Sequence, residues 1–583
     1  MALRQLLLVI LVFGWSEVAF GRFIDEARTL RVNGRVYNRM AMAVESAADH
    51  TRDQTPYNSF NMLQNRTFIQ MELRHEVMDL VNGTYAGRMN MLAPIFAPLQ
   101  HLGLEDLSYF VTYRGEYDGV WDYGPDVFSE RYPVLVDCGF DGDQQRRRPR
   151  SFDGCTRSDT RRALRNRHRV FEAYVDFSWE ALFIRIGRQN LSWGETDAFR
   201  LLDQINPLDG SFGGFLVSLD ERRVPLDMAR IVYSLEDIGP FSELNLEAFG
   251  VLDDAVAAPT PTGSPWSVPN PPGIRGLVKK PARNLTDSRG GFRITARVGD
   301  LTLSAAHYYT FLDAPMVQTV TPKGRPVNLA QFKAAVDADQ TTQFLVDKFK
   351  ANVRFPKIAI SGATASFSVA PLDAVVRSEV AVFWREYFFK NSGPDNILGP
   401  VLTEGQITPG FRQVGLDPAT GSPLVTYKSD IDRSHVVRWS LGVDVNRYIR
   451  YLNPQQSFIF SGQMFATHIV DFDNTPLRDV RPYGFGGYAV AVRDPNHDAL
   501  VEIDQHQFVN TLSISTSFRS GVIAPRLVFF YDWQGAWLVQ PGVTLTRDPF
   551  RLTLQYNYID GQFNGIGFLR DRDNLITQLE MVF

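Results

Sequence analysis

Connections of two contrasting lengths alternate along this chain, and this alternation restricts its fold more than any single motif does. Tight turns are expected at Gly299-Asp300, at Pro371 and at Ser520-Gly521. Long polar segments separate these turns, among them 253–290 and 313–353. A sheet with short connections at one end and long connections at the other is typical of an antiparallel barrel that spans a membrane.

The segments between these connections carry apolar residues at every second position. Near the N-terminus, Leu30 and Val32 alternate with Arg31 and Asn33. A period of two places apolar groups on one face and charged groups on the other, which suits a wall with lipid outside and water inside. The sequence therefore predicts an all-β fold, with residues 22–583 forming one transmembrane antiparallel β-barrel of about 18 strands, in a range of roughly 16 to 18.

An even number of strands leaves both termini on the periplasmic side, with short periplasmic turns and long external loops. One connection departs from the pattern. Residues 82–105 fall on the short side and are long, so this segment is a plug, a periplasmic contact or two further strands.

The first 21 residues have the form of an export signal. Arg4 precedes the apolar run Leu6 to Phe13, and Ala19-Phe20-Gly21 has the small residues of a signal-peptidase site. The run is well short of the roughly 20 residues that a spanning helix needs. We therefore expect cleavage near Arg22 and a mature protein in the outer membrane, and the small net charge of -5 does not indicate a nucleic-acid partner.

The C-terminal strand carries a separate signal. Leu575, Leu579, Met581 and Phe583 occupy alternate positions, and the last of them is an aromatic residue. A terminal aromatic residue on an apolar strand face resembles the assembly signal of bacterial outer-membrane barrels. Leu579, Met581 and Phe583 are therefore predicted to engage the barrel-assembly machinery.

Polar and charged residues are most concentrated in the loop 190–225, which follows an alternating strand. By the parity of the strands this loop starts at the outer rim and is long enough to fold back into the lumen. Its residues are predicted either to form a charged constriction or to act as a structural latch that holds the loop against the barrel wall. The residues concerned are Arg188, Gln189, Trp193, Glu195, Asn206, Asp209, Glu221, Arg222 and Arg223.

Another insertion, 119–169, contains both cysteines of the chain, Cys138 and Cys155. In an oxidising compartment a loop-closing disulfide is favoured over a metal site, because no cluster of His or Cys accompanies the pair. Ten arginines lie between Arg146 and Arg169. On an external loop they suit the phosphates of lipopolysaccharide and outer-leaflet lipid, inside the lumen they favour anions, and they are also compatible with a solvated loop.

The loop 313–353 contains a candidate helix. Leu329, Phe332 and Val336 have helical spacing within Val327 to Phe349. Such a helix would pack on the barrel rim, cap the mouth or bind an apolar solute.

Motifs for catalysis are missing from the sequence, which has no G-x-S-x-G elbow, H-E-x-x-H, Walker loop or G-x-G-x-x-G after a strand. Ser434 and His435 are adjacent, so on a strand they point to opposite faces. We expect no enzyme activity, no cofactor and no metal.

The ordered combination of Gly187-Arg188-Gln189, Trp193-Gly194-Glu195 and Ile205-Asn206-Pro207-Leu208-Asp209 resembles an uncharacterised family of Gram-negative outer-membrane barrels. Arg223-Val224-Pro225-Leu226 and the segment Leu569 to Asp573 extend the resemblance over most of the mature chain. Members of that family look like channels and are often encoded near resistance-nodulation transporters and lipoproteins. The resemblance implies traffic in hydrophobic compounds, with a periplasmic lipoprotein or an inner-membrane transporter as partner.

Three functions remain open from the sequence. The first is a channel that passes a hydrophobic or amphipathic small molecule through a partly obstructed lumen. The second is a general or anion-selective porin for polar solutes, and the third is a surface-binding barrel without a role in transport.

Overall fold

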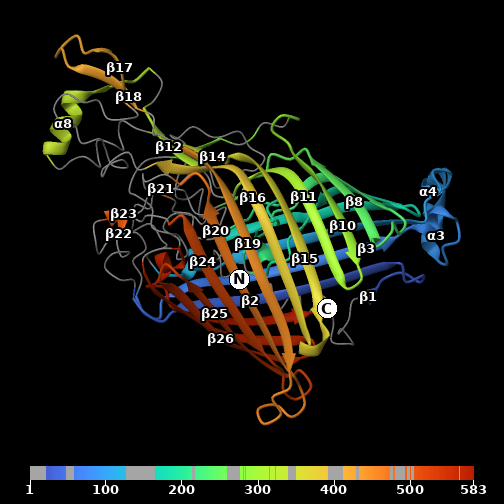
Figure 1. The fold of residues 1–583 in the computed structure, drawn as a ribbon. Coiled ribbons are helices and arrows are strands. Elements are labelled where there is room, and N and C mark those ends of the chain that lie inside the picture. Colours follow the sequence, from blue (N-terminus) through green and yellow to red (C-terminus); the bar gives the residue numbers. More distant parts are fainter. Residues whose placement is uncertain are drawn as a thin grey trace.

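The structure is a computed structural model. It describes residues 22–46, 58–125, 165–197, 199–212, 217–258, 276–279, 281, 284–313, 316–321, 324–338, 350–390, 411–427, 432–472, 477–478, 493–494, 499–500, 504–562 and 565–583. These residues form a closed antiparallel barrel of 18 strands, as the alternation predicts (Figure 1).

The barrel strands follow one another around the wall in chain order. They are β2 (Leu30–Ala43), β3 (Met62–Glu76), β4 (Asp106–Asp118), β5 (Asn166–Ser178), β6 (Leu182–Gln189), β7 (Leu226–Ser234), β8 (Ser242–Val251), β10 (Arg289–Val298), β11 (Leu301–Phe311), β15 (Lys357–Val369), β16 (Ala374–Lys390), β19 (Asp432–Arg447), β20 (Phe458–Ile469), β24 (His506–Ser515), β25 (Ile523–Asp532), β26 (Ala536–Arg547), β27 (Phe550–Gly561) and β28 (Asn574–Val582). The last strand pairs with the first, with Val582 opposite Arg35 and Asn574 opposite Ala43. This pairing closes the wall and leaves no free sheet edge.

Side chains alternate between the lumen and the outside along each strand. On β7, Leu226 and Met228 are buried inside the barrel, whereas Ile231 and Tyr233 on the opposite face are 44% and 45% exposed. An exposed apolar row on the outer face is what a lipid environment accommodates. The lumen row therefore carries the residues that determine what the barrel holds.

The tight turns lie where the sequence places them. Gly299, at φ 57°, allows β10 to turn directly into β11, and a short 3-10 turn at Ala370–Leu372 joins β15 to β16. The long connections, such as those before β10 and β15, leave the opposite end of the strands. Short and long connections thus occupy opposite ends of the barrel.

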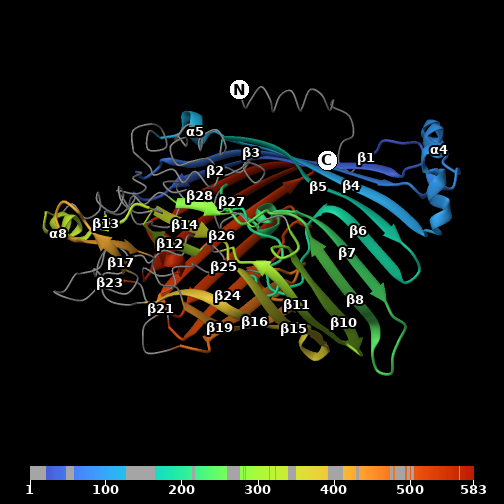
Figure 2. The same ribbon diagram turned by 90° about the horizontal axis from the view of Figure 1, so that it is seen from above.

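The one long connection on the short-turn side is helical. It contains α3 (Met78–Val81), η1 (Arg88–Leu92), α4 (Ala93–Phe96) and η2 (Ala97–Leu102), which extend beyond this end of the barrel (Figures 1 and 2). Leu80 and Val81 pack with Leu107 at the base of β4. The segment 82–105 therefore consists of neither two further strands nor a plug in the lumen.

The loops at the other end carry small elements of their own. Apart from α5 (Val120–Tyr123), they form the short sheets β9 (Gly276–Lys279), β12 (Met316–Val320) and β14 (Lys350–Arg354), and β13 (Val327–Asn328), β17 (Phe411–Leu416) and β18 (Pro423–Tyr427). The expected helix is present as α8 (Leu329–Asp337), next to β13, and lies near β17 and β18 (Figure 1). Residues 339–349 of the candidate helix lie outside the described residues. No helix in the described ranges is both long enough and apolar enough to cross a membrane.

Two predictions fall outside the described residues, namely the export signal at 1–21 and the disulfide between Cys138 and Cys155. One prediction needs correction. Strand β5 begins at Asn166, so Arg167 and Arg169 belong to the barrel wall and not to an external arginine-rich loop. Both face the lumen, because their strand partners Glu116 and Arg114 also lie in the lumen row of β4.

Candidate functional site

The loop 190–225, here called the infolded loop, leaves β6 and enters β7 after crossing the interior of the barrel. Apart from 198 and 213–216, all of its residues are described. Its side chains and backbone contact lumen-facing residues of strands on all sides, namely β2, β3, β4, β5, β8, β11, β16, β20 and β25. The described part of the loop therefore lies among lumen-facing side chains.

Asn206 fastens the two ends of the infolded loop together. Its Oδ1 accepts a hydrogen bond from the backbone N–H of Leu191 at 2.8 Å, and its Nδ2 donates to the carbonyls of Val224 at 2.9 Å and Gln189 at 3.3 Å. The Gln189 amide in turn donates to the Met228 carbonyl at 3.2 Å. Both amide side chains are fully buried, so these contacts replace water for buried backbone groups.

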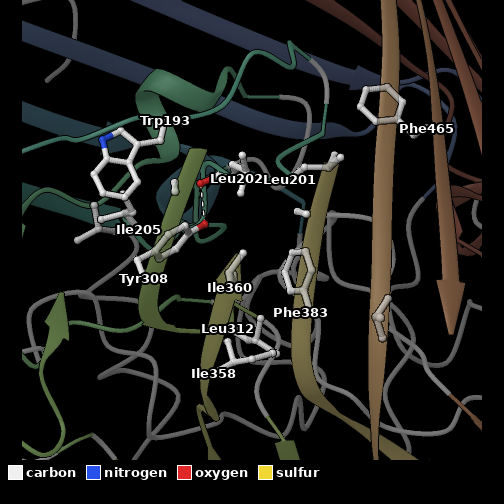
Figure 3. Packing of buried hydrophobic residues seen from close by; sticks show 14 of the residues in the cluster. Trp193, Leu201, Leu202, Ile205, Tyr308, Leu312, Ile358, Ile360, Phe383 and Phe465 are labelled. Carbon is white, nitrogen blue, oxygen red and sulfur yellow. Dashed lines mark hydrogen bonds between the residues drawn. The ribbon is translucent and has the colours of Figure 1, made fainter. Parts of the chain in front are cut away.

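Trp193 seats the loop on the apolar side of the lumen. Its ring is 1% exposed and packs edge-on against Phe249 and Tyr308, with centroids 5.0 and 5.6 Å apart. The Tyr308 hydroxyl donates to the Leu202 carbonyl at 2.6 Å, as Figure 3 shows. Farther along, Phe199 meets Phe465 edge-on at 5.1 Å. Aromatic contacts therefore hold the first half of the loop.

An unbroken row of apolar side chains lies next to this seat on the lumen face. In each pair of neighbouring strands from β11 to β20, one member of the row stands opposite the next. All are at most 1% exposed. The members of this apolar row are Tyr308, Ile360, Phe383, Val436 and Ile469.

Beside the apolar row, β16 binds the backbone of the infolded loop through two charged residues. The Glu379 carboxylate accepts from the N–H of Glu195 at 2.7 Å and from the N–H of Leu202. Arg377 donates to the Glu195 carbonyl at 2.8 Å and pairs with Asp197 at 2.7 Å. Glu195 thus takes part through its main chain.

Two arginines of the loop itself form ion pairs close to Asn206. Arg200 contacts Asp313, in the loop after β11, and donates to the Asn206 carbonyl at 2.7 Å. Arg223 donates to Asp203 at 3.1 Å through Nε and to Asp220 at 2.6 Å through Nη1. Arg222 is buried, and its burial, together with the neighbouring charge of Arg200, lowers its pKa to about 10.

The opposite side of the lumen is strongly basic. Five arginines on β2 to β5 face the second half of the infolded loop, and we call them the arginine wall. They are Arg35, Arg66, Arg114, Arg167 and Arg169.

Two loop carboxylates meet the arginine wall. Asp209 pairs with Arg167 at 2.6 Å and with Arg169 at 3.8 Å. Glu221 accepts from Arg66 at 3.0 Å and from Arg35 at 3.3 Å. These contacts join residues on β2, β3 and β5 to one segment of the loop.

Further groups surround these two carboxylates. Glu221 also accepts from the Tyr37 hydroxyl at 2.7 Å, and Arg114 donates to the Glu221 carbonyl at 3.3 Å. The ring of Phe212 lies beneath two guanidinium groups, 4.3 Å from that of Arg167 and 5.4 Å from that of Arg66. A ring face next to a guanidinium group is a favourable arrangement.

The arginine wall determines the ionisation of both loop carboxylates. Burial opposes the charge on Asp209, but the charges of Arg167 and Arg169 outweigh it and hold the pKa of Asp209 below its ordinary value. Burial also opposes the charge on Glu221, and Arg66 leads the groups that lower its pKa. Both carboxylates are therefore charged at neutral pH.

Most of the residues that the sequence singles out lie in this assembly, including Trp193, Asn206, Asp209 and Glu221. Arg188 does not. It stands opposite Ala173 and Asp227 on the outward row of β6, two positions from Ile186, which is 53% exposed. Its Nε is buried and has no hydrogen-bond partner among the described residues.

Sequence reasoning did not single out the partners of the loop on the barrel wall. The arginine wall, Arg377, Glu379 and Tyr308 are dispersed over strands that are distant in sequence. Arg66 and Arg114 occupy charged positions of alternating strands, so the sequence indicates that they face the lumen. It does not indicate that they converge on one loop. Within the described residues, no group of three or more His, Cys, Asp or Glu is arranged to hold a metal ion.

Solved structures of outer-membrane proteins are similar to this chain over most of its length. OccAB2 of Acinetobacter baumannii matches with a TM-score of 0.41 and 10% identity over 97% of this chain and 99% of that chain. OpdK of Pseudomonas aeruginosa, solved with vanillate, matches with a TM-score of 0.40 and 9% identity over 95% and 98% of the two chains. Wzi of Escherichia coli, a carbohydrate-binding β-barrel, matches with a TM-score of 0.36 and 9% identity over 94% and 84%.

At these low TM-scores and identities, the likenesses give no information on what this chain binds. No curated protein matches the chain. A family of sequences does match over residues 81–583, which is most of the chain. The chain belongs to the family described as "Protein of unknown function (DUF1302)".

Proposed function

We propose that this protein is an outer-membrane channel that passes a hydrophobic or amphipathic small molecule, with the infolded loop as its gate. The observation that carries the proposal is the apolar row on the lumen face. A lumen built only for water and polar solutes has no use for five consecutive strands that present Tyr308, Ile360, Phe383, Val436 and Ile469 inward. Such a row offers an apolar molecule a surface on which it loses contact with water.

The infolded loop acts as a latch in the closed state and leaves a constriction when it moves. Its ion pairs with the arginine wall and its aromatic seat support this role. Of the residues predicted from the sequence, Trp193, Asn206, Asp209, Glu221 and Arg223 hold the loop. The lumen of an open barrel is wet, so charges left there on release are tolerated far better than charges facing lipid.

We place the protein in the outer membrane, exported by residues 1–21 and surrounded by lipid and lipopolysaccharide. The exposed apolar outer face of the strands supports this location. The C-terminal residues Leu579, Met581 and Phe583 remain the candidate signal for the barrel-assembly machinery. A periplasmic lipoprotein or an inner-membrane transporter is the expected partner for delivery of the cargo.

The arginine wall favours a second function, an anion-selective porin for polar solutes. Planar-bilayer conductance separates the two. We expect the natural protein to show small, infrequent openings, and a variant in which a short Gly-Ser linker replaces 192–222 to show a large, steady conductance. A large, stable, anion-selective current from the natural protein would overturn the channel for hydrophobic compounds and favour the porin.

Cargo passage needs a second measurement, because conductance reports ions only. Vesicles that contain the loop-shortened variant are expected to take up an uncharged apolar dye faster than vesicles that contain the natural protein. Migration on a gel with and without heating verifies that both barrels are folded. Equal dye uptake by both barrels and by empty vesicles would contradict the proposal.

A further inference from the structure

With the infolded loop in place, four carboxylates of the described residues lie within 4 Å of guanidinium groups of the arginine wall, and the charge of buried Asp118 also acts on Arg66. The wall itself contributes Glu116, within 2.7 to 3.5 Å of Arg66, Arg167 and Arg169, and Glu580, 3.8 Å from Arg35. The remaining ion pairs come from the two loop residues described above. The loop therefore supplies counter-charge that this side of the barrel does not provide for itself.

Several donors of the arginine wall are left over. Nε of Arg66, Nε of Arg167 and Nε of Arg169 are buried and have no hydrogen-bond partner among the described residues. Nη2 of Arg169 lies 3.5 Å from Oε1 of Glu116, and neither of these atoms makes a hydrogen bond to a described residue. A buried donor without an acceptor costs free energy, and an arginine presents its donors as a planar fork that fits an oxyanion. These unused donors on β3 and β5, on either side of β4, fit an acceptor with more oxygen atoms than the loop carboxylates provide.

Aromatic rings support the same arginines from the side. The guanidinium group of Arg114 lies 3.3 Å from the ring centroid of Phe171, and that of Arg66 lies 5.1 Å from the ring centroid of Phe68. Both rings are almost fully buried. Stacking fixes the planes of the guanidinium groups and places an apolar surface next to the charged one.

These features, taken with the apolar row on the other side, give a lumen with one basic wall and one apolar wall. We propose that the arginine wall binds the anionic head group of an amphiphile, which competes with Asp209 and Glu221 for the guanidinium groups and so releases the infolded loop. The inference rests on the proposed channel and names its cargo as a molecule with one anionic head and one apolar tail.

Competition follows from the geometry. While Asp209 and Glu221 occupy Arg167, Arg66 and Arg35, an incoming anion has no access to the same donors. The anion therefore binds more tightly when the loop is released, and a ligand that prefers one state shifts the population toward it. Release without an anion would leave the arginines without this counter-charge, so the loop stays closed in the absence of cargo.

The test uses the full chain in a planar bilayer at neutral pH and about 0.15 M salt, where charge is only partly screened. The probes are decanoate, decanol and acetate, which separate a charged head with a tail from a tail alone and from a charge alone. We expect decanoate to raise the fraction of time that the channel is open, and decanol and acetate at the same concentrations to leave it unchanged.

Two variants locate the effect. The double variant Asp209→Asn, Glu221→Gln keeps the shape of both side chains and removes their charge, so we expect it to be open at least about tenfold more often without decanoate. The control is Glu243→Gln, which removes an exposed carboxylate that pairs with Arg297 at 3.2 Å and has no part in the contacts of the infolded loop. Its half-maximal decanoate concentration should stay within about twofold of the natural protein, because distant sites act independently.

Each other outcome counts against the inference. If decanol opens the channel as well as decanoate does, the anionic head is not recognised. If acetate opens the channel as well as decanoate does, the site binds small anions, and the proposal of an amphiphilic cargo is wrong. If decanoate has no effect although the loop-shortened barrel conducts, the inference fails and the proposed channel stands. Heat-dependent migration shows whether the loop-shortened barrel is folded. A folded loop-shortened barrel that does not conduct would contradict both the inference and the proposed channel.

Discussion

Arg66 on β3 donates a hydrogen bond to Glu221, 155 residues farther along the chain, over 3.0 Å. Both side chains are almost completely buried inside the barrel, at 2% and 3% exposure. A pair of charges so far from water is kept only where other groups satisfy it, and here Arg35 and Tyr37 complete the site. The interior of this barrel is thus organised around the attachment of a loop.

Asn206 is expected to hold the infolded loop in shape. Asn206→Ala leaves the N–H of Leu191 and the carbonyls of Gln189 and Val224 without their partner, at a cost of about 1 to 3 kcal/mol for each buried group. Hydrogen exchange read by mass spectrometry should show faster exchange over 190–197 with unchanged barrel strands. Asn206→Asp keeps the acceptor for Leu191, so its exchange rate over 190–197 should lie between those of the natural protein and Asn206→Ala. Equal exchange in all three proteins would refute the role of Asn206 in holding the loop.

Gly362 on β15 provides room for the loop. A Cβ atom added there would lie 2.3 Å from the Val380 carbonyl oxygen and 2.5 Å from Leu202. Gly362→Ala should therefore shift the backbone of β15 against β16 as well as push Leu202 away from the wall, and destabilise the closed loop by about 1 to 3 kcal/mol, as overpacking does elsewhere. The effect is measured as faster exchange at 200–206.

The control for this change is Gly462→Ala on β20. A Cβ atom at Gly462 meets no described atom within 4 Å, so this variant should exchange like the natural protein. If both variants behave alike, the close approach of Leu202 to the wall has no energetic consequence.

Trp193 is expected to hold the infolded loop closed through the shape of its ring and not through its N–H group. The ring fills the space between Phe249 and Tyr308, and Nε1 has no hydrogen-bond partner among the described residues. Trp193→Ala should weaken loop closure by about 3 to 5 kcal/mol and raise the open fraction in a bilayer. Trp193→Phe keeps an aromatic ring in the seat and should cost less than about 1.5 kcal/mol. A phenylalanine variant as open as the alanine variant would show that the ring contacts do not hold the loop.

The latch should be insensitive to pH near neutrality and should open in acid. Because the pKa values of Asp209 and Glu221 lie below their ordinary values, the stabilisation is fully present above about pH 4 and is lost as the pH falls through the lowered values. Conductance should be constant between roughly pH 5 and 8 and rise below roughly pH 4.

The charge-free variant Asp209→Asn, Glu221→Gln is the control for the acid response, since it has no carboxylates to protonate at the arginine wall. Its conductance should show no rise that belongs to these two groups. An identical rise in acid for the variant and the natural protein would assign the response to other residues.

Phe583 closes the wall at the last strand. Its backbone N–H and carbonyl exchange hydrogen bonds with Gly34 at 2.9 and 2.7 Å, and its ring lies where a Cβ of Gly34 would stand, 2.5 Å away. Phe583→Ala should reduce the yield of heat-modifiable barrel in the membrane severalfold. Leu575→Ala, on the same outward row but 44% exposed, is the matched control, and an equal loss in both would argue against a special role for the terminal ring.

Local patterns are enough to predict the strands of the barrel. A period of two along Leu30 to Asn33 and a tight turn at Gly299 are properties of neighbouring residues, and the chain forms strands and a turn there. The segment 82–105 is harder to predict, because the three short helices within it carry no long periodic signal. Packing of Leu80 and Val81 on the base of β4 determines its position.

The sequence by itself determined that the chain forms a barrel, which end carries the long loops, and that 190–225 is its most concentrated polar loop. These properties follow from alternation and turn chemistry, which act over a few residues. Only the tertiary structure decided that Asp209 and Glu221 meet Arg167 and Arg66, and that Arg188 faces outward. The physical reason is that such contacts depend on the register of strands and on closure of the sheet, which join residues far apart in the chain.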